Sequence, residues 1–189
     1  MARLTREEVL ARLRRGDSLA GLDLREADLS YEDLRGADLR HADLRDAHLQ
    51  NANLERANLS GANLTRAFLF GANLNRARLD GAILVETNLQ DTNMESASAT
   101  NAQMSGCALF GAHMAGANLQ GANLTAARLK RANLKGANLS AATLRGAHLE
   151  RADLTGADLR KADLQGAHLA HTSIEGANMQ GALTDNLHA

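Results

Sequence analysis

The chain has 189 residues, a formal net charge of −1, one cysteine, and neither proline nor tryptophan. Disordered chains combine few aliphatic residues with high net charge, so this leucine-rich and nearly neutral chain is expected to fold around a core. Cys107 has no partner for an internal disulfide, and no apolar stretch approaches the length of a membrane span, so we expect a cytoplasmic protein without membrane contact.

The first predicted element is a short helix over residues 5–15. Thr5 and Glu8 have the spacing of a capping box, in which each side chain accepts a hydrogen bond from the backbone of the other residue. Val9, Leu10 and Leu13 form an apolar stripe on this helix, and we expect that side to cover the open edge of the first coil that follows. A membrane-surface helix would need a longer apolar side than these few aliphatic residues provide.

After the helix the sequence repeats every five residues, without insertion or deletion. The stretch 52–67 reads ANLERANLSGANLTRA, and from Leu19 to Met179 every fifth residue is leucine in all but six units. A straight helix cannot keep this pattern on one side, because its apolar position drifts by about 140° per repeat. A straight strand fails too, since its side chains alternate with a period of two. The period therefore predicts a coil that turns a corner in each unit.

Units such as ANLSG, ANLTR and ADLRK resemble the A(D/N)LxX unit of the pentapeptide-repeat proteins. The resemblance implies an all-β fold, a right-handed quadrilateral β-helix (a β-solenoid) with four units and twenty residues in each coil. Residues 22–181 would then form about eight four-sided coils. We expect a capping helix over 1–16, the pentapeptide-repeat β-helix over 17–184 and a C-terminal tail over 185–189.

The five places of a unit have different expected roles; we number them so that Ala is the first and Leu the third. The first and third places are expected to point inward, and the second and fourth outward. Asn and Asp at the second place can bind nearby backbone groups. The fifth place is frequently glycine, as in Gly61 and Gly71, which suits a corner that needs unusual backbone angles.

The middle of the chain departs from the repeat. Ala99 replaces leucine at a third place, and Met94 and Met104 hold the third places on either side. Flexible methionine can fill the space that a smaller residue leaves, so we expect compensated packing rather than a ligand cavity. Cys107 holds a first place and is expected to be a small core residue.

The sequence contains no nucleotide-binding loop, zinc spacing or nucleophile motif, so we expect no enzymatic activity and no cofactor. His148 and His168 lie twenty residues apart and are expected to stack on adjacent coils, with His171 nearby. This set lacks a fourth ligand, so exposed imidazoles are favoured over a metal site. A basic cluster is expected to be a solvated face without direct nucleic-acid binding, because there is no basic stripe and no exposed aromatic residue interleaved with it for stacking. Its members are Arg128, Lys130, Arg131 and Lys135.

Charge is unevenly distributed, with nine acidic residues between residues 17 and 51. Four arginines are interleaved with them: Arg25, Arg35, Arg40 and Arg45. We interpret this band as a solvated face with alternating ion pairs. The alternative is a DNA-mimicking protector or inhibitor of DNA gyrase or topoisomerase IV. The gyrase-protecting branch of the family commonly has Phe at the third place and a longer C-terminal segment, both of which this chain lacks.

Five bulky apolar residues occupy outward places where the repeat is otherwise polar. In a coil of twenty residues Phe68, Phe70 and Phe110 fall on one face, and Ile83 and Val85 fall on the neighbouring face. An exposed apolar patch is typical of an interface. The sequence therefore predicts a non-catalytic interaction scaffold that binds a protein partner through this patch.

The C-terminal segment GALTDNLHA is too short for a second capping helix. We expect the edge of the last coil to be open or to meet a partner, which would give a homodimer through the uncapped C-terminal coil. A third hypothesis, a detached accessory module of a larger secretion or signalling system, has no test in the sequence itself.

Overall fold

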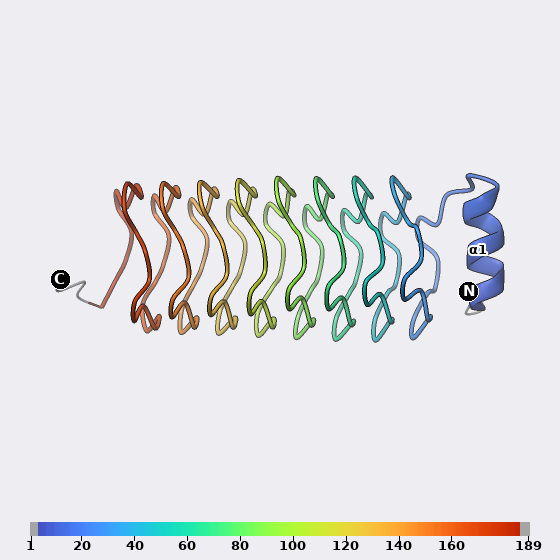
Figure 1. The fold of residues 1–189 in the computed structure, drawn as a ribbon, viewed down its shortest axis with the longest axis horizontal. Coiled ribbons are helices and arrows are strands. Elements are labelled where there is room, and N and C mark those ends of the chain that lie inside the picture. The colour runs from blue at the N-terminus through green and yellow to red at the C-terminus, as the bar shows by residue number, and fades with distance from the viewer. Residues whose placement is uncertain (1–3, 186–189) are drawn as a thin grey trace.

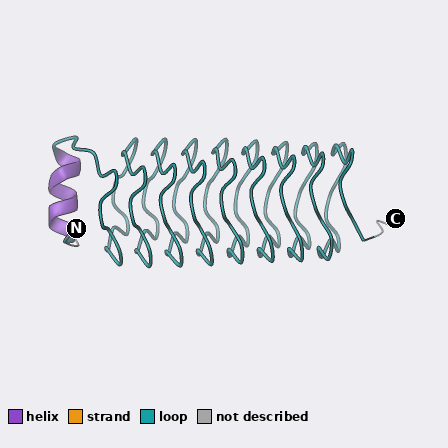
Figure 2. Cartoon of the chain, turned by 180° about the vertical axis from the view of Figure 1, so that it is seen from behind, coloured by secondary structure: helices purple, strands orange, loops and turns teal. Residues whose placement is uncertain are grey.

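The computed structural model describes residues 4–185, which form one helix, α1 (Arg6–Arg14), and a rod of stacked coils (Figure 1). All bridges between the coils are parallel and join residues twenty positions apart, from Asp23 with Asp43 to Asp163 with Leu183. Each unit contributes a single bridging residue at its second place, so no longer strand is present among residues 4–185 (Figure 2). Four units therefore complete one coil, as the resemblance implied.

Helix α1 covers the N-terminal end of the rod, as predicted (Figure 1). Both bonds of the capping box are present: Glu8 N donates to Thr5 Oγ1 at 3.3 Å, and Thr5 N donates to Glu8 Oε2 at 2.8 Å. Val9 is completely buried, and Leu4 and Leu13 pack against the core. Residues 4–185 include no helix with the length and apolar character needed to cross a bilayer.

A single hydrophobic core runs along the axis of the rod. The first and third places point into it, as predicted; Ala122 and Leu124, for instance, are both 0 % exposed. Cys107 is equally buried, donates its thiol to the carbonyl oxygen of Leu84 at 2.8 Å, and has a pKa raised to about 12 by burial. The inward assignment of Cys107 is thus confirmed.

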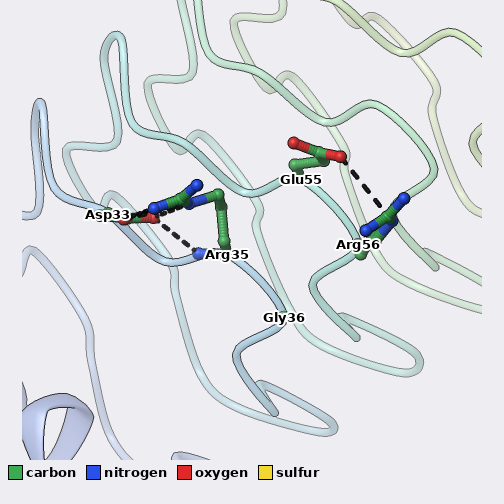
Figure 3. A pocket seen from close by; sticks show the side chains of 5 residues that line it. All are labelled: Asp33, Arg35, Gly36, Glu55 and Arg56. Carbon is green, nitrogen blue, oxygen red and sulfur yellow. Dashed lines mark hydrogen bonds and ion pairs between the residues drawn. The ribbon is translucent and has the colours of Figure 1, made fainter.

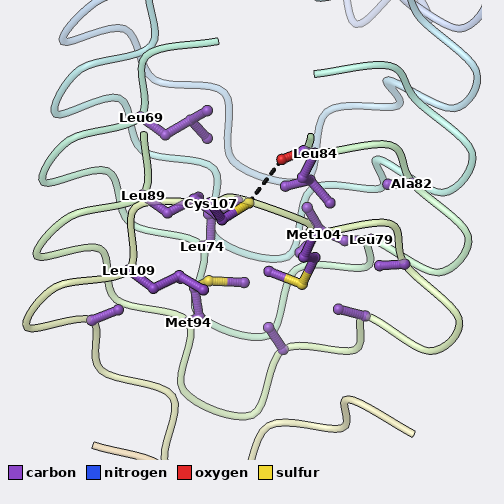
Figure 4. Close-up of a cluster of buried hydrophobic side chains, with 14 of the residues drawn as sticks. Leu69, Leu74, Leu79, Ala82, Leu84, Leu89, Met94, Met104, Cys107 and Leu109 are labelled. Carbon is purple, nitrogen blue, oxygen red and sulfur yellow. Dashed lines mark hydrogen bonds between the residues drawn. The ribbon is translucent and has the colours of Figure 1, made fainter. Parts of the chain in front are cut away.

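The core stays closed where the repeat weakens. Met94 and Met104 are completely buried, and Ala99 is 1 % exposed. Figure 4 shows the two thioether side chains inside the core, below the leucines of the preceding coils. The placement of the methionines within the core agrees with the predicted compensation, because flexible side chains adapt to irregular space.

Every corner of the rod has a left-handed backbone conformation. All 16 glycines hold fifth places with positive φ, as expected from their flexibility, but eighteen other residues adopt the same conformation at the remaining corners. A side chain at positive φ costs about 1–2 kcal/mol. The coil enforces this conformation, because the fifth-place N–H is bonded to the following coil, as in Ala141 N to Arg160 O at 2.8 Å.

This backbone strain predicts opposite effects for two matched substitutions. Gly136 (φ +63°) has open space where a Cβ would be added, so Gly136→Ala adds strain without a clash and is expected to lower the free energy of unfolding by up to about 1 kcal/mol. Ala141→Gly (φ 56°) removes strain and is expected to change stability slightly in the other direction. Urea unfolding of both variants measures the effects, and equal signs would contradict the strain argument.

The C-terminal end of the rod is less covered than the N-terminal end. Leu169, Ile174 and Met179 hold third places in the last described coil and are partly exposed, Ile174 by 38 %. No coil follows them within residues 4–185. A homodimer through this end stays a prediction, and most of the predicted tail, residues 186–189, lies outside the described residues.

Candidate protein-binding face

One side of the rod has side chains unlike those of the other three. We call it the aromatic face and define it by eight units that lie above one another: 27–31, 47–51, 67–71, 87–91, 107–111, 127–131, 147–151 and 167–171. Their second-place residues form one continuous column of bridges: Asp28, His48, Phe68, Asn88, Ala108, Arg128, His148 and His168. The face contains all three phenylalanines and the only tyrosine of the sequence, Tyr31.

The aromatic face lacks local hydrogen bonds that most units of the other three faces form. On the other faces the second place is mostly Asn or Asp, whose side chain accepts the fourth-place N–H, as in Glu55 N to Asn53 Oδ1 at 3.2 Å. On the aromatic face only Asp28 and Asn88 accept this bond, and the other six described units lack it. Because the substitutions remove a stabilising bond, they indicate selection for something other than the fold.

Stacked rings follow from the vertical alignment of the units, since adjacent coils are about 4.8 Å apart. The rings of His48 and Phe68 stack with centroids 4.9 Å apart, and those of His148 and His168 with centroids 4.5 Å apart. The stacking of the second pair confirms the expectation from the spacing. No group of three or more His, Cys, Asp or Glu side chains in residues 4–185 is placed to hold a metal ion.

Arg131 of the basic cluster contacts a half-buried aromatic ring, and the sequence reasoning did not anticipate this contact. The guanidinium carbon of Arg131 lies 5.7 Å from the centroid of the Phe110 ring, a cation–π distance. The two residues are twenty-one positions apart, so they meet only because the coil brings consecutive turns together. Lys135 belongs to the next face, where it lies 3.9 Å from Asp153.

The structure brings together three of the five residues predicted to form the patch. Phe68 and Phe70 are 40 % and 43 % exposed, and Phe110 is half-buried on the same face. Ile83 is 38 % exposed and Val85 is half-buried, but both lie on the preceding face, since Ile83 bridges to Asn63 and Gln103. A single patch of all five residues stays a prediction.

Sequence reasoning missed part of this face. Tyr31 is 78 % exposed at one of its corners, and His48 stacks on Phe68. The residue numbers alone place Tyr31 and His48 on this face, because their units lie a multiple of twenty residues from the units of Phe68 and Phe110.

A shallow groove of about 310 Å³ lies on the aromatic face. Ala108, only 6 % exposed, has the smallest side chain of the bridge column and lies at the bottom of the groove. Phe110 forms an aromatic wall of the groove, and three of the lining residues are basic. The lining residues are Gln90, Ala108, Phe110, Arg128, Lys130, His148 and Glu150. The pKa of the Glu150 carboxyl is lowered, first by its own backbone N–H and then by His148, whose Nδ1 lies 3.7 Å away.

A second depression lies on a neighbouring face near the N-terminal end (Figure 3). Arg35 folds back onto Asp33 with two bonds, Nε to Oδ1 at 2.8 Å and Nη2 to Oδ2 at 2.6 Å, and this lowers the pKa of Asp33. Glu55 and Arg56 lie 3.7 Å apart. The charged groups that line this depression are therefore already paired.

The pairing of Asp33 with Arg35 recurs wherever a unit contains the sequence DLR. Asp23 and Arg25 form the same two bonds, and the pKa of Asp23 falls to about 2, mainly because of them. Acidic residues along this whole band lie within ion-pair distance of an arginine, among them Asp17, Asp23, Asp28, Glu32, Asp33, Asp38, Asp43 and Asp46. The interpretation of the acidic band as paired charges is confirmed.

Comparison with known proteins agrees with the geometry. A family model described as pentapeptide repeats matches in eight copies, in overlapping stretches between residues 18 and 183. HetL, a pentapeptide repeat protein involved in heterocyst differentiation regulation from the cyanobacterium Nostoc sp. strain PCC 7120, is 31% identical over 96% of this chain and 97% of its own, with a TM-score of 0.37. No match was found among curated proteins.

Two further solved structures are similar to this chain. Rfr23 from the cyanobacterium Cyanothece 51142 is 28% identical over 93% of this chain and 97% of its own, with a TM-score of 0.26. A trypsin-treated variant of QnrB1, a plasmid-mediated fluoroquinolone resistance protein, is 21% identical over 84% of this chain and 90% of its own, with a TM-score of 0.49. With its unbroken five-residue period and the family match along the rod, the chain belongs to the pentapeptide-repeat family.

Proposed function

We propose that the protein is a non-catalytic scaffold that binds a protein partner through the aromatic face. The observation that carries this proposal is the loss of the Asn or Asp side chain, with its hydrogen bond, in six of the eight units of that face. Aromatic and arginine side chains, which replace it or stand beside it, are enriched among residues that dominate binding energy. The rod presents them on a rigid surface, which reduces the entropy lost on binding.

A catalytic role has little support in the arrangement of the carboxylates. General acid catalysis needs a carboxyl group with a pKa raised towards neutral pH. The pKa values of Asp33 and Glu150, which line the two depressions described above, are shifted downward instead.

The gyrase alternative requires a surface with uncompensated negative charge that resembles DNA. The ion pairs of the acidic band work against this requirement, because each arginine offsets the charge of the carboxylate beside it. A supercoiling assay with DNA gyrase and a fluoroquinolone tests it directly. No change in supercoiling or drug sensitivity at micromolar protein would remove the alternative.

Replacing two rings of the aromatic face tests the scaffold proposal. The variant Phe70→Ser/Phe110→Ser is expected to lose the proteins that the immobilised parent retains, whether a second copy or another protein, because these rings supply apolar contact area. Thermal unfolding should change little, because Phe70 is 43 % exposed and Phe110 is half-buried. Quantitative mass spectrometry of the retained proteins measures the effect.

The matched control carries the same new side chains on the opposite face. Gln120 and Gln180 hold exposed fourth places two units further along the coil, so Gln120→Ser/Gln180→Ser should retain every partner. Unchanged binding by the phenylalanine variant would contradict the proposal. Unfolding far below the parent temperature would assign these rings to the core instead.

A further inference from the structure

We propose that the partner of the aromatic face is a second copy of this chain, with the two rods antiparallel and related by a two-fold axis that crosses the face at Asn88 and Gln90. The inference rests on the proposed function, because it names the occupant of the same face. It follows from the positions of a projecting ring, that of Phe68, and of the groove at Ala108. The two lie on opposite sides of Asn88 along the rod.

Phe68 and Ala108 lie at equal distances from Asn88, one coil below and one coil above it in the same bridge column. Phe68 projects outward and is 40 % exposed, whereas Ala108 lies at the bottom of the groove. A two-fold axis that passes through Asn88, perpendicular to the rods, places the bridge column of one copy against the bridge column of the other, and the two columns run in opposite directions. Phe68 of each copy then enters the groove at Ala108 of the other, and the contact forms twice.

The fourth-place column matches in the same way. Phe70 of one copy lies opposite Phe110 of the other, which adds an aromatic contact beside each filled groove. Gln90 lies on the axis opposite its own symmetry mate, and an amide side chain can both donate to and accept from an identical group. The interface is therefore self-complementary, with polar amide side chains on the axis and aromatic contacts one coil to either side.

Charges towards the ends of the face are also complementary. The level of Asp28 and Tyr31 in one copy meets the level of His148 and Arg151 in the other. The Asp28 side chain is 59 % exposed, although it lies 3.8 Å from Arg6, and Tyr31 is 78 % exposed, so both can contact the other copy. Two contacts bring like groups together: Asp91 lies near its own symmetry mate at the corner, and His48 faces Arg128 in the bridge column.

A parallel arrangement of the two rods is less favourable. A two-fold axis along the rods would lay the second-place column of one copy on the fourth-place column of the other at the same level. Arg128 would then face Lys130, two exposed cations, in both halves of the interface. The antiparallel arrangement instead sets Lys130 opposite Gln50.

The size of the face sets the expected affinity. Three outward residues span roughly 10 Å across the face and eight coils span about 35 Å along it, which corresponds to a few hundred Å² on each copy. This is below the ~800 Å² per partner of a standard interface, so we expect a weak dimer with a micromolar dissociation constant.

Exchanging the projecting ring and the groove tests the proposal. Sedimentation equilibrium at protein concentrations up to several hundred micromolar is expected to show a dimer of the parent, weakened about tenfold or more by Phe68→Ala, which removes the ring. Ala108→Phe should weaken it similarly, because it fills the groove. The double variant Phe68→Ala/Ala108→Phe moves the ring by two coils and should restore the dimer. Phe68 itself shows that a second place of this face accommodates phenylalanine, and thermal unfolding verifies that each variant is folded.

A cysteine on the axis gives an independent measurement. Gln90→Cys is expected to form a disulfide-linked dimer on oxidation, whereas Gln120→Cys on the opposite face should stay monomeric; the native Cys107 is buried and can remain. A parent that is monomeric at all concentrations overturns the proposal, and the scaffold function still stands if another protein binds the face. Self-association that is unchanged in both single variants, Phe68→Ala and Ala108→Phe, and is lost in Ile174→Asp would assign the dimer to the C-terminal coil and also overturn the proposal.

Discussion

Leu124→Ala is expected to lower the free energy of unfolding by about 2–5 kcal/mol. Leu124 is 0 % exposed, and its N–H is bonded to the carbonyl oxygen of Thr143 in the next coil at 2.7 Å. The backbone bonds hold the coils at a fixed spacing, so the walls cannot close around the space that the smaller side chain leaves. Urea unfolding followed by circular dichroism measures the loss.

Asn138→Ser is the control for Leu124→Ala. Asn138 points outward, accepts the N–H of Ser140 at 3.0 Å and donates to Asn118 Oδ1 at 3.2 Å. A shorter side chain at this place removes at most these two part-buried hydrogen bonds, each worth about 1 kcal/mol. Equal losses for the two variants would contradict the assignment of inward and outward places. A far-ultraviolet dichroism spectrum dominated by helix would contradict the fold itself.

Val9→Asp is expected to detach helix α1 from the first coil. Val9 is completely buried where the helix covers the end of the rod, and an unpaired carboxylate there costs several kcal/mol. In a solenoid each coil contacts only its neighbours, so the damage should remain at this end. Hydrogen exchange should show faster exchange at the amides of Leu19 and Leu24, whereas the amide of Leu124 keeps its protection.

Arg14→Asp places the same new side chain on the exposed side of the same helix. Its expected cost is limited to about 0.5–1 kcal/mol from an acidic group near the helix C-terminus. Protection of the first coil should therefore match the parent. Equal exchange at Leu19 in Val9→Asp and in the parent would show that α1 does not support the first coil.

The candidate site could be predicted only in part. The numbering placed the three phenylalanines on one face and stacked His148 on His168, because positions twenty residues apart coincide in such a coil. It did not reveal the contact of Arg131 with Phe110, since that contact also depends on how a long side chain crosses from one coil to the next. The groove at Ala108 was likewise absent from the sequence reasoning, because it depends on the side chains that surround it.

The sequence by itself determined the coil and the direction of each place, because both follow from a period of five that is unbroken from Leu19 to Met179. The number of units in a coil came from the family resemblance and is confirmed by the twenty-residue bridges. Only the tertiary structure decided that eighteen corners without glycine take the left-handed conformation, and which arginine pairs with which carboxylate in the acidic band. The backbone preferences of residues other than glycine oppose the left-handed conformation at these corners, and hydrogen bonds to the following coil overcome those preferences. The pairing of arginines with carboxylates depends on side-chain geometry, which a repeat pattern does not specify.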